Sequence, residues 1–292
     1  MKIAVISDIH GNAPAFKAVL EDAKKQGVTE YIIAGDYCLS GPYPDECISI
    51  MRGLERSYII RGNEEQYLEN LDGKDQSKWT DGQMQISYWS YRNVSVDNRK
   101  FLFDLPRRID LKINGVDIHI AHMRSEFADE YIETGLDDLP DMDEAFKDKD
   151  EGVYIFGHSH IQWSYRLKDK NIVLINPGSC GMPLDLIRNS MPYTVLEISD
   201  EGEISVDQRR VPFDVEAYIE DLKKTTQYTD ANVWSKVIIK ELRYAKEHIA
   251  YFLPFVEKYA QEIGDDRRPF AVETWERAYE IWNKGLEGNN VK

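Results

Sequence analysis

Apolar runs and amphipathic segments alternate along the first third of the chain. Residues 2–7 form an apolar run typical of a buried strand, and apolar residues between Phe16 and Ala23 then recur at the spacing of one helix face. Asn12 can cap the start of that helix, and Gly27 can follow its end. The alternation continues with a strand, a helix and a strand, expected at 31–34, 47–54 and 57–60. This pattern is typical of an α/β layered fold.

The middle of the chain predicts further helices and a larger set of strands. Helical sequence is expected from Glu64 and again around 86–91, and Asn114-Gly115 is a strong signal for a β-hairpin. Residues 125–152 are rich in Asp and Glu and predict a solvated loop with short helical pieces. Strands are expected at 108–113, 116–121, 153–156, 162–167, 172–175, 193–198 and 204–209.

The pattern changes after Pro212, where the strands stop. Residues 215–282 are helical in pattern, with an interruption at 264–269. We therefore expect an α/β body at 1–212 and a helical C-terminal appendage at 213–292. The many aromatic residues of the appendage allow three roles, which are packing on the body, a lid over a substrate, or a homodimer interface.

Composition and charge narrow the classes of function. The 292 residues are 42% hydrophobic, so most of the chain should fold, and no apolar run approaches the roughly 18 residues that cross a bilayer. The first apolar run is too short for a secretory signal, so we expect a cytoplasmic protein without a membrane partner. With 36 Lys plus Arg against 52 Asp plus Glu, the net charge of −16 argues against nucleic acid as a partner. A small anionic substrate remains allowed, because bound metal ions can reverse the local field.

Candidate chemistry lies directly after the expected strands. Five strands are followed by side chains that can bind metal ions, namely Asp8 and His10, Asp36, Asn63, His122, and His158 with His160. The carboxyl ends of strands are where open α/β sheets place their ligand sites. An isolated Asp-x-His is more often a turn cap with a surface histidine, but this conjunction at five strand ends leaves that interpretation little room.

The set consists of hard oxygens and imidazoles, with no thiolate. The three cysteines, Cys38, Cys47 and Cys180, are far apart in sequence without paired spacing, which argues against a disulfide framework and against a thiolate zinc site. Seven ligands exceed the needs of one tetrahedral ion and suit two ions if one carboxylate bridges them. Two such ions could hold a hydroxide for attack on a tetrahedral phosphorus centre.

In order and spacing, these motifs resemble those of the calcineurin-like metallophosphoesterases. The resemblance covers about residues 1–212 and includes Asp8-Ile9-His10-Gly11-Asn12, Gly35-Asp36, Gly62-Asn63-Glu64-Glu65, Gly157-His158-Ser159-His160 and Asn176-Pro177-Gly178-Ser179. The chain looks like the bacterial branch with small phosphodiesterases and asymmetrical diadenosine tetraphosphate hydrolases. The resemblance implies a four-layer αββα sandwich of two mixed β-sheets, with the helical appendage added.

The resemblance also implies a role for each ligand. Asp8, His10 and His160 would bind one ion, Asn63, His122 and His158 would bind the second, and Asp36 would bridge both. The ions would be divalent or trivalent first-row metals, and Mn, Fe, Ni, Co and Zn all suit such a donor set. Asp36 and Asn63 would thereby belong to the catalytic residues.

One position departs from the commonest pattern of the family. Many members carry a His after Gly-Asn that assists the leaving group, whereas this chain carries Glu64. A carboxylate donates a proton to an alkoxide less readily than an imidazolium does. If Glu64 is catalytic in place of that His, the substrate is expected to release a group already stable as an anion, such as a nucleotide from a phosphoanhydride.

Five further residues are candidates for binding the substrate. Arg124, Arg61 and Arg188 could meet phosphate oxygens, and Tyr37 and Tyr43 could stack on a base. Each also has an ordinary structural interpretation, as a surface ion pair for the arginines and as packing for the tyrosines.

These observations predict a dinuclear metal-dependent hydrolase acting on a small phosphate compound, with a nucleotide favoured. The main hypothesis is a phosphodiesterase or a dinucleoside polyphosphate hydrolase, working by in-line attack of a hydroxide held between the two ions. A phosphomonoesterase acting on a nucleotide or phosphoprotein is the alternative within the enzyme class. A metal-free scaffold of the same fold is the alternative outside it, and the seven filled ligand positions argue against it.

Overall fold

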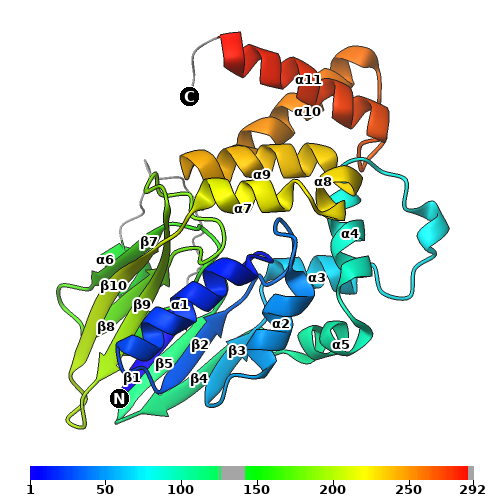
Figure 1. Ribbon diagram of the computed structural model, residues 1–292. Coiled ribbons are helices and arrows are strands. Elements are labelled where there is room, and N and C mark those ends of the chain that lie inside the picture. Colours follow the sequence, from blue (N-terminus) through cyan, green and yellow to red (C-terminus); the bar gives the residue numbers. More distant parts are fainter. Residues whose placement is uncertain (124, 126–141, 289–292) are drawn as a thin grey trace.

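The computed structural model describes residues 1–123, 125 and 142–288 and shows two stacked β-sheets with helices on their outer faces (Figure 1). The first sheet has the strand order β10-β9-β1-β2-β3, and the second has the order β4-β5-β6-β8-β7. Both sheets are mixed, which confirms the predicted sandwich. The helical layers described below complete its four layers.

The first sheet is built around three parallel strands, β1 (Lys2–Ile6), β2 (Glu30–Ala34) and β3 (Ser57–Ile60). Strands β9 (Ser190–Ile198) and β10 (Ile204–Pro212) join it in antiparallel fashion. Strand β9 starts three residues before its predicted start, and β10 ends three residues after its predicted end. The predicted strands after the hairpin are otherwise confirmed to within one or two residues.

The second sheet contains the predicted hairpin. Strands β4 (Arg108–Ile113) and β5 (Val116–Ala121) are joined by Asn114 and Gly115, whose φ angles of 47° and 82° fit the expected tight turn. Strands β6 (Gly152–Ile155) and β8 (Ile172–Pro177) continue in parallel with β5, and β7 (Gln162–Arg166) pairs with β8 at the edge.

The sandwich core follows from the alternation of side chains along each strand. Ile3 and Val5 of β1 point between the two sheets, whereas Ala4 and Ile6 point toward the helices on the outer face. All four side chains are fully buried. A strand buried on both faces therefore reads as a continuous apolar run, which is what residues 2–7 showed.

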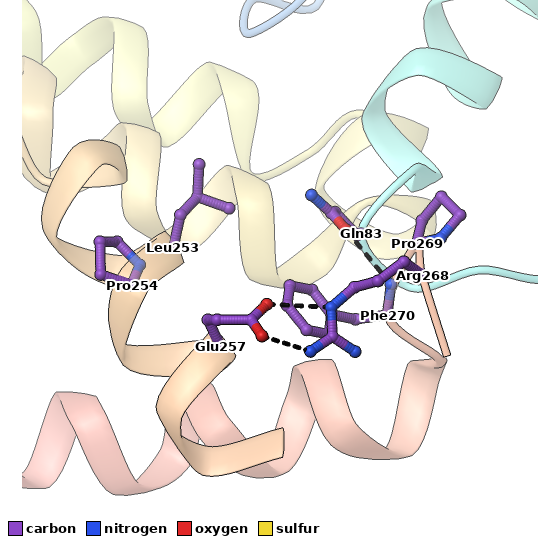
Figure 2. A pocket seen from close by; sticks show the side chains of 7 residues that line it. All are labelled: Gln83, Leu253, Pro254, Glu257, Arg268, Pro269 and Phe270. Atoms are coloured by element: carbon purple, nitrogen blue, oxygen red, sulfur yellow. Dashed lines mark hydrogen bonds and ion pairs between the residues drawn. The ribbon is translucent and has the colours of Figure 1, made fainter. Parts of the chain in front are cut away.

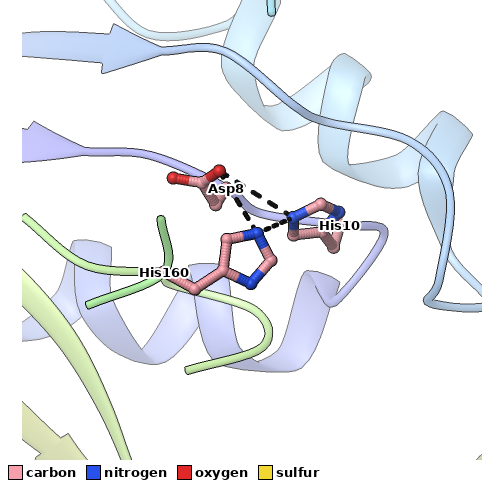
Figure 3. A group of neighbouring side chains, drawn as sticks. All are labelled: Asp8, His10 and His160. Atoms are coloured by element: carbon pink, nitrogen blue, oxygen red, sulfur yellow. Dashed lines mark hydrogen bonds and ion pairs between the residues drawn. The ribbon is translucent and has the colours of Figure 1, made fainter. Parts of the chain in front are cut away.

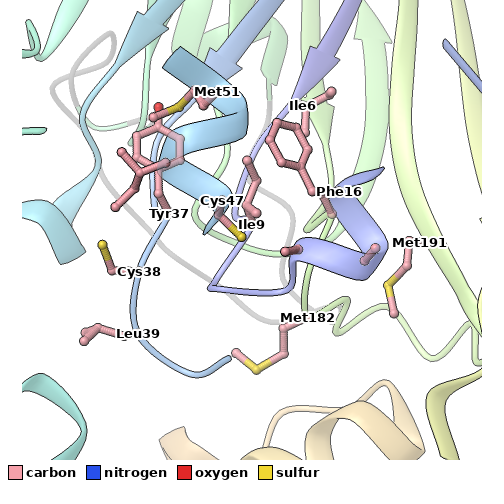
Figure 4. Packing of buried hydrophobic residues seen from close by; sticks show 14 of the residues in the cluster. Ile6, Ile9, Phe16, Tyr37, Cys38, Leu39, Cys47, Met51, Met182 and Met191 are labelled. Atoms are coloured by element: carbon pink, nitrogen blue, oxygen red, sulfur yellow. The ribbon is translucent and has the colours of Figure 1, made fainter. Parts of the chain in front are cut away.

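Helices α1 (Ala13–Lys25) and α2 (Pro44–Arg52) cover the outer face of the first sheet, and α6 (Met142–Phe146) covers that of the second. Asn12 caps α1 as predicted, since its side chain accepts a hydrogen bond from the Ala15 N–H at 3.1 Å. Figure 4 shows the packing beneath α1, where Phe16 meets Ile6 and Ile9.

Short helices connect the first sheet to the second. They are α3 (Asn63–Glu69), a 3₁₀ turn at Gln76–Lys78, α4 (Gln85–Asn93) and α5 (Val96–Asp104). The sequence pattern indicated α3 and α4 but not a separate α5, whose start is marked by the Ser95 cap on the Asn98 N–H. Residue 125 and residues 142–151, which include α6, are the described parts of the acidic 125–152 segment before β6.

The C-terminal segment is helical as predicted. It contains α7 (Val215–Leu222), α8 (Thr226–Asp230), α9 (Asn232–Tyr244), α10 (Ile249–Ile263) and α11 (Val272–Gly288). Helix α9 lies between two apolar clusters: Ile238 and Leu242 share the core of the body, while Val237 packs with Phe252 and Trp275 of α10 and α11. Helices α7 and α9 thus share the core of the body. The division of the chain into a body at 1–212 and an appendage at 213–292 stays a prediction.

Within the described residues, every helix is too short or too polar to span a bilayer.

Candidate metal centre

The predicted ligands converge because each directly follows a strand whose carboxyl end lies at the same edge of the sandwich. Asp8 and His10 follow β1, Asp36 follows β2, Asn63 begins α3 after β3, His122 follows β5, and His158 and His160 follow β6. That edge faces α7 and α9 (Figure 1). The structure therefore brings six of the seven residues into groups that could hold an ion, and it places Asn63 next to Glu64, whose backbone N–H donates to Asp36.

The backbone turns sharply at these positions. Asp8, His10, Asp36, His158 and His160 have φ angles between 49° and 67°, in the left-handed region that non-glycine residues rarely adopt. Hydrogen bonds between loops hold these turns, with the Asp8 N–H donating to the Gly35 carbonyl at 3.0 Å and the His10 N–H donating to the Asp36 carbonyl at 3.1 Å. Strain of this kind is concentrated at functional sites, where the surrounding structure enforces it.

One group of side chains consists of Asp8, His10 and His160 (Figure 3). The Nε2 atoms of the two histidines are 2.9 Å apart, and they lie 3.9 and 3.5 Å from Asp8 Oδ1. All three side chains are buried. His160 Nδ1 donates to the Met182 carbonyl at 2.9 Å, which leaves the lone pair on His160 Nε2 directed at His10.

A second group consists of Asp36, His122 and His158. His122 Nδ1 donates to the Ala34 carbonyl at 2.6 Å, so its Nε2 is the nitrogen left for a proton or a metal ion. That Nε2 lies 3.1 Å from Asp36 Oδ2, at ion-pair distance, but in an orientation that makes no hydrogen bond. Asp36 also falls within a third group, with His10 and Glu64, and so links the second group to His10 of the first.

The donor atoms fit divalent metal ions. Asn63 Oδ1 and His122 Nε2 are buried and have no hydrogen-bond partner, and a buried polar atom without a partner is costly. Imidazole nitrogens whose lone pairs face one another repel unless a cation lies between them. Hard oxygens and neutral imidazoles are the ligands that first-row divalent ions accept.

The pKa values of the histidines also indicate that positive charge is stabilised at this site. Burial alone would lower the pKa of His10, but the Glu64, Asp36 and Asp8 carboxylates raise it to about 9. Burial would likewise lower the pKa of His122, yet Asp36 and Asp8 raise it to about 10. Without a metal, protons supply the positive charge, so protons and metal ions compete for this site.

Two neighbouring carboxylates follow Asn63. Glu64 is buried, and its Oε2 lies 3.1 Å from His10 Nδ1, while its backbone N–H donates to Asp36 Oδ1 at 3.0 Å. Glu65 is fully buried and accepts hydrogen bonds from the backbone N–H groups of Gly62, Asp36 and Tyr37, at 2.7 to 3.1 Å. Glu65 thus ties the loop that carries Asp36 to the loop that carries Asn63.

Both tyrosines proposed as base-stacking residues have structural contacts. Tyr37 is fully buried and its hydroxyl lies within hydrogen-bonding distance of the carbonyls of Ile33 in β2 and Ile60 in β3, so it exposes no face to a substrate. This prediction was wrong because the loop after β2 folds inward beneath α2. The hydroxyl of Tyr43 hydrogen-bonds Asp221 of α7 and links the body to the C-terminal helices.

Two of the three arginines proposed to bind phosphate have other partners. Arg61 is only 8% exposed and its guanidinium bonds Gln66, Glu69 and the Phe103 carbonyl. Arg188 is exposed and lies over the Tyr244 ring, 5.1 Å from its centroid. The third, Arg124, lies outside the described residues.

Tyr67 is a residue that the sequence analysis missed. It lies one helical turn after Asn63 on α3, is 48% exposed, and its phenol interacts with the Asn63 side chain. The i, i+4 spacing of an aromatic residue from a candidate ligand could have identified it.

A hollow of about 610 Å³ lies apart from these ligands, between α10 and the segment before α11 (Figure 2). Its apolar lining includes Pro254 and Phe270. Its charged groups are already paired, because Arg268 donates to both carboxylate oxygens of Glu257 at 2.9 and 2.6 Å.

Comparison with known proteins adds a family and a fold. The profile of the calcineurin-like phosphoesterase superfamily domain matches residues 1–201. An uncharacterized protein of Methanocaldococcus jannaschii is 30% identical over 240 residues, which is 76% of this chain and 92% of that protein.

Two solved structures share the fold. A metallophosphoesterase from Sphaerobacter thermophilus aligns with a TM-score of 0.67 at 21% identity, over 84% of this chain and 99% of that one. A hypothetical protein from Pyrococcus horikoshii aligns with a TM-score of 0.62 at 20% identity, over 85% of this chain and 99% of that one.

Proposed function

The chain belongs to the calcineurin-like phosphoesterase superfamily, whose members are metal-dependent phosphoester hydrolases, and we propose that it is a dinuclear phosphodiesterase or dinucleoside polyphosphate hydrolase. The observation that carries this proposal is the pair of ligand groups joined by Asp36. Two neighbouring groups that are linked through Asp36 and His10 suit two ions rather than one.

Each side chain has a definite task in this proposal. Asp8, His10 and His160 hold one ion, Asn63, His122 and His158 hold the other, and Asp36 spans both. Ions bound there supply Lewis-acid activation of water and neutralise charge at the phosphate. Of the metals that the donor set accepts, Mn is our first choice for assays; Fe, Ni, Co and Zn fit the same atoms.

The protein's own contribution is to fix these atoms before a substrate arrives. The Nδ1 contacts of His10, His122 and His160 set which nitrogen of each ring is free, and Glu65 joins the two loops that bear Asp36 and Asn63. Preorganisation of this kind lowers the barrier because little reorganisation is needed as charge develops.

We favour substrates whose leaving group is stable as an anion. Glu64 stands where many family members carry a proton-donating His, and its carboxylate is engaged with His10. Proton transfer to an alkoxide is therefore expected to be weak, whereas a nucleotide leaving a phosphoanhydride needs little help. We also place the protein in the cytoplasm, with a homodimer through the C-terminal helices left as a further hypothesis.

Hydrolysis of bis(4-nitrophenyl) phosphate with added Mn²⁺ tests the proposal. Asp36→Asn and His158→Ala should each abolish metal-stimulated hydrolysis, because each removes a ligand. His119→Ala is a matched control, since His119 lies on β5 three residues before His122 but contacts Asp110 instead of the ligand groups. Full activity in both ligand variants would refute the proposal.

A substrate screen separates the remaining alternatives. Diadenosine tetraphosphate, cyclic nucleotides and monoesters would be compared under the same conditions, with product analysis to locate the bond that is cut. Preference for monoesters would favour a phosphomonoesterase. Absence of bound metal by elemental analysis, together with no hydrolysis, would favour a metal-free scaffold.

A further inference from the structure

We propose that Glu64 is a positioning residue that fixes His10 as a metal ligand, rather than an acid that protonates the leaving group. This inference rests on the proposed dinuclear site. It gives a role to the Glu64 carboxylate, which stands at the position where the family commonly carries His.

His10 presents its two ring nitrogens to different partners. Nε2 faces His160 Nε2 at 2.9 Å on the side of Asp8, whereas Nδ1 faces Glu64 Oε2 at 3.1 Å. An ionised carboxylate can only accept from the ring, so Nδ1 carries a hydrogen and Nε2 is the nitrogen left for a metal ion. Glu64 therefore selects the tautomer in which His10 can bind an ion together with His160.

His10 differs from the other buried ligand histidines in the charge of its Nδ1 partner. His122 donates to the Ala34 carbonyl and His160 to the Met182 carbonyl, both neutral acceptors. A carboxylate partner increases the electron density on the imidazole and strengthens its bond to a metal ion. The ion held by Asp8, His10 and His160 should thus depend on Glu64 more than the second ion does.

The surroundings of Glu64 favour this role over proton donation. The side chain is 11% exposed, and it is held from both sides, with Oε2 at His10 and the backbone N–H on Asp36 Oδ1. An acid for the leaving group must instead reach the oxygen that departs from phosphorus. Because the Glu64 carboxylate contacts His10, the leaving-group oxygen would be protonated by solvent or stabilised by the ions.

Metal titration is the direct test. Isothermal titration of the apo protein with Mn²⁺ should show two sites in the wild type, and Glu64→Ala should weaken one of them about 10–100-fold, the range for partners of metal-bound histidines. The metal affinity of Glu64→Gln should lie between those of the wild type and Glu64→Ala, because the amide oxygen of Gln still accepts from His10 Nδ1 but carries no charge. Glu46→Gln is the matched control, since its half-exposed carboxylate pairs with Lys17 across the outer helices α1 and α2.

Two further readouts separate positioning from proton donation. In the zinc-loaded protein, the ¹⁵N spectrum of His10 should show a protonated Nδ1 in the wild type and in Glu64→Gln, and this signal should be lost or shifted in Glu64→Ala. At saturating metal, the Glu64 variants should slow diesters with 4-nitrophenol and with phenol as leaving groups by the same factor.

The outcomes are distinct. If the wild type binds no metal and hydrolyses none of the diesters, the proposed function fails. If the wild type is active but the Glu64 variants bind both ions with wild-type affinity, or lose more rate with the poorer leaving group, the positioning role is overturned. Glu64→Gln keeps the test decisive if circular dichroism shows that Glu64→Ala does not fold.

Discussion

Gly62→Ala would test how closely the two loops of the centre must approach one another. Gly62 precedes Asn63 at the end of β3 and lies directly against Asp36. A Cβ added at this position would lie 2.1 Å from Asp36 Oδ1 and 2.7 Å from the Asp36 backbone N. The backbone conformation does not require glycine here, because any residue can adopt the φ of −96°. Glycine is required because the two loops approach each other too closely for a Cβ.

The size of the disturbance follows from these distances. Real Cβ contacts do not fall below 3.0 Å, so the added Cβ and Asp36 Oδ1, which start at 2.1 Å, would have to separate by about 0.9 Å. Metal coordination tolerates deviations of roughly 0.2 Å, and a misplacement of about 1 Å can cost on the order of 100-fold in rate. We therefore expect metal affinity to fall about 10–100-fold and folding stability to fall by about 1–3 kcal/mol.

Calorimetry with Mn²⁺, thermal unfolding without metal, and hydrolysis of bis(4-nitrophenyl) phosphate would measure these three effects. Gly285→Ala is the control, because no heavy atom lies within 4 Å of a Cβ added there, in the last part of α11. It should leave metal binding unchanged and stabilise the helix by about 0.5–1 kcal/mol. Two ions bound to Gly62→Ala with wild-type affinity would show that Asp36 is not confined as we argue.

Two other side chains give separate predictions. Tyr67→Phe should lower kcat/KM for diesters about 10-fold while leaving metal content unchanged, because an exposed phenol beside Asn63 can donate to a phosphate oxygen; steady-state kinetics with metal analysis would check it, and an unchanged kcat/KM would contradict it. Burial and the nearby Glu247 raise the pKa of Glu241 well above its ordinary 4.5, so the folded state keeps a proton that the unfolded state loses. The free energy of unfolding should therefore fall as pH rises above about 4.5, by at most roughly 1.4 kcal/mol per pH unit, and Glu241→Gln should remove this slope in thermal melts. An identical slope in the variant would rule out Glu241 as its source.

The metal ligands could be predicted from sequence because their positions are covalently tied to the strands. A side chain one to five residues beyond a strand, as these ligands are, must lie near the edge of the sheet where that strand ends. The apolar runs located those ends within a few residues, and the order of Asp, His and Asn after the strands identified the candidate ligands. Three-dimensional contacts add the orientation of each imidazole, which depends on distant partners such as Met182.

The substrate contacts were poorly predicted for the opposite reason. An arginine or tyrosine near a motif takes whichever partner the folded chain brings to it, and those partners are distant in sequence. Arg61 meets the Phe103 carbonyl 42 residues away, and Tyr43 meets Asp221, 178 residues away. Local spacing carries no information on such pairs, whereas the Glu64 contact with His10 could be recognised only once both loops were placed.

The C-terminal helices also bear on the metal centre, although the sequence pattern separates them from it. Gln227 of α8 donates to the Ser40 carbonyl at 2.6 Å, and Asp221 of α7 bonds Tyr43, so two contacts hold the loop that follows Asp36. A third contact joins Leu186, in the loop after Met182, to the Ala245 carbonyl at the end of α9, at 2.8 Å. These loops carry backbone in the left-handed region and buried carboxylates, both of which cost free energy. Packing of α7–α9 on the body can offset that cost, which makes these helices part of what holds the ligands in place.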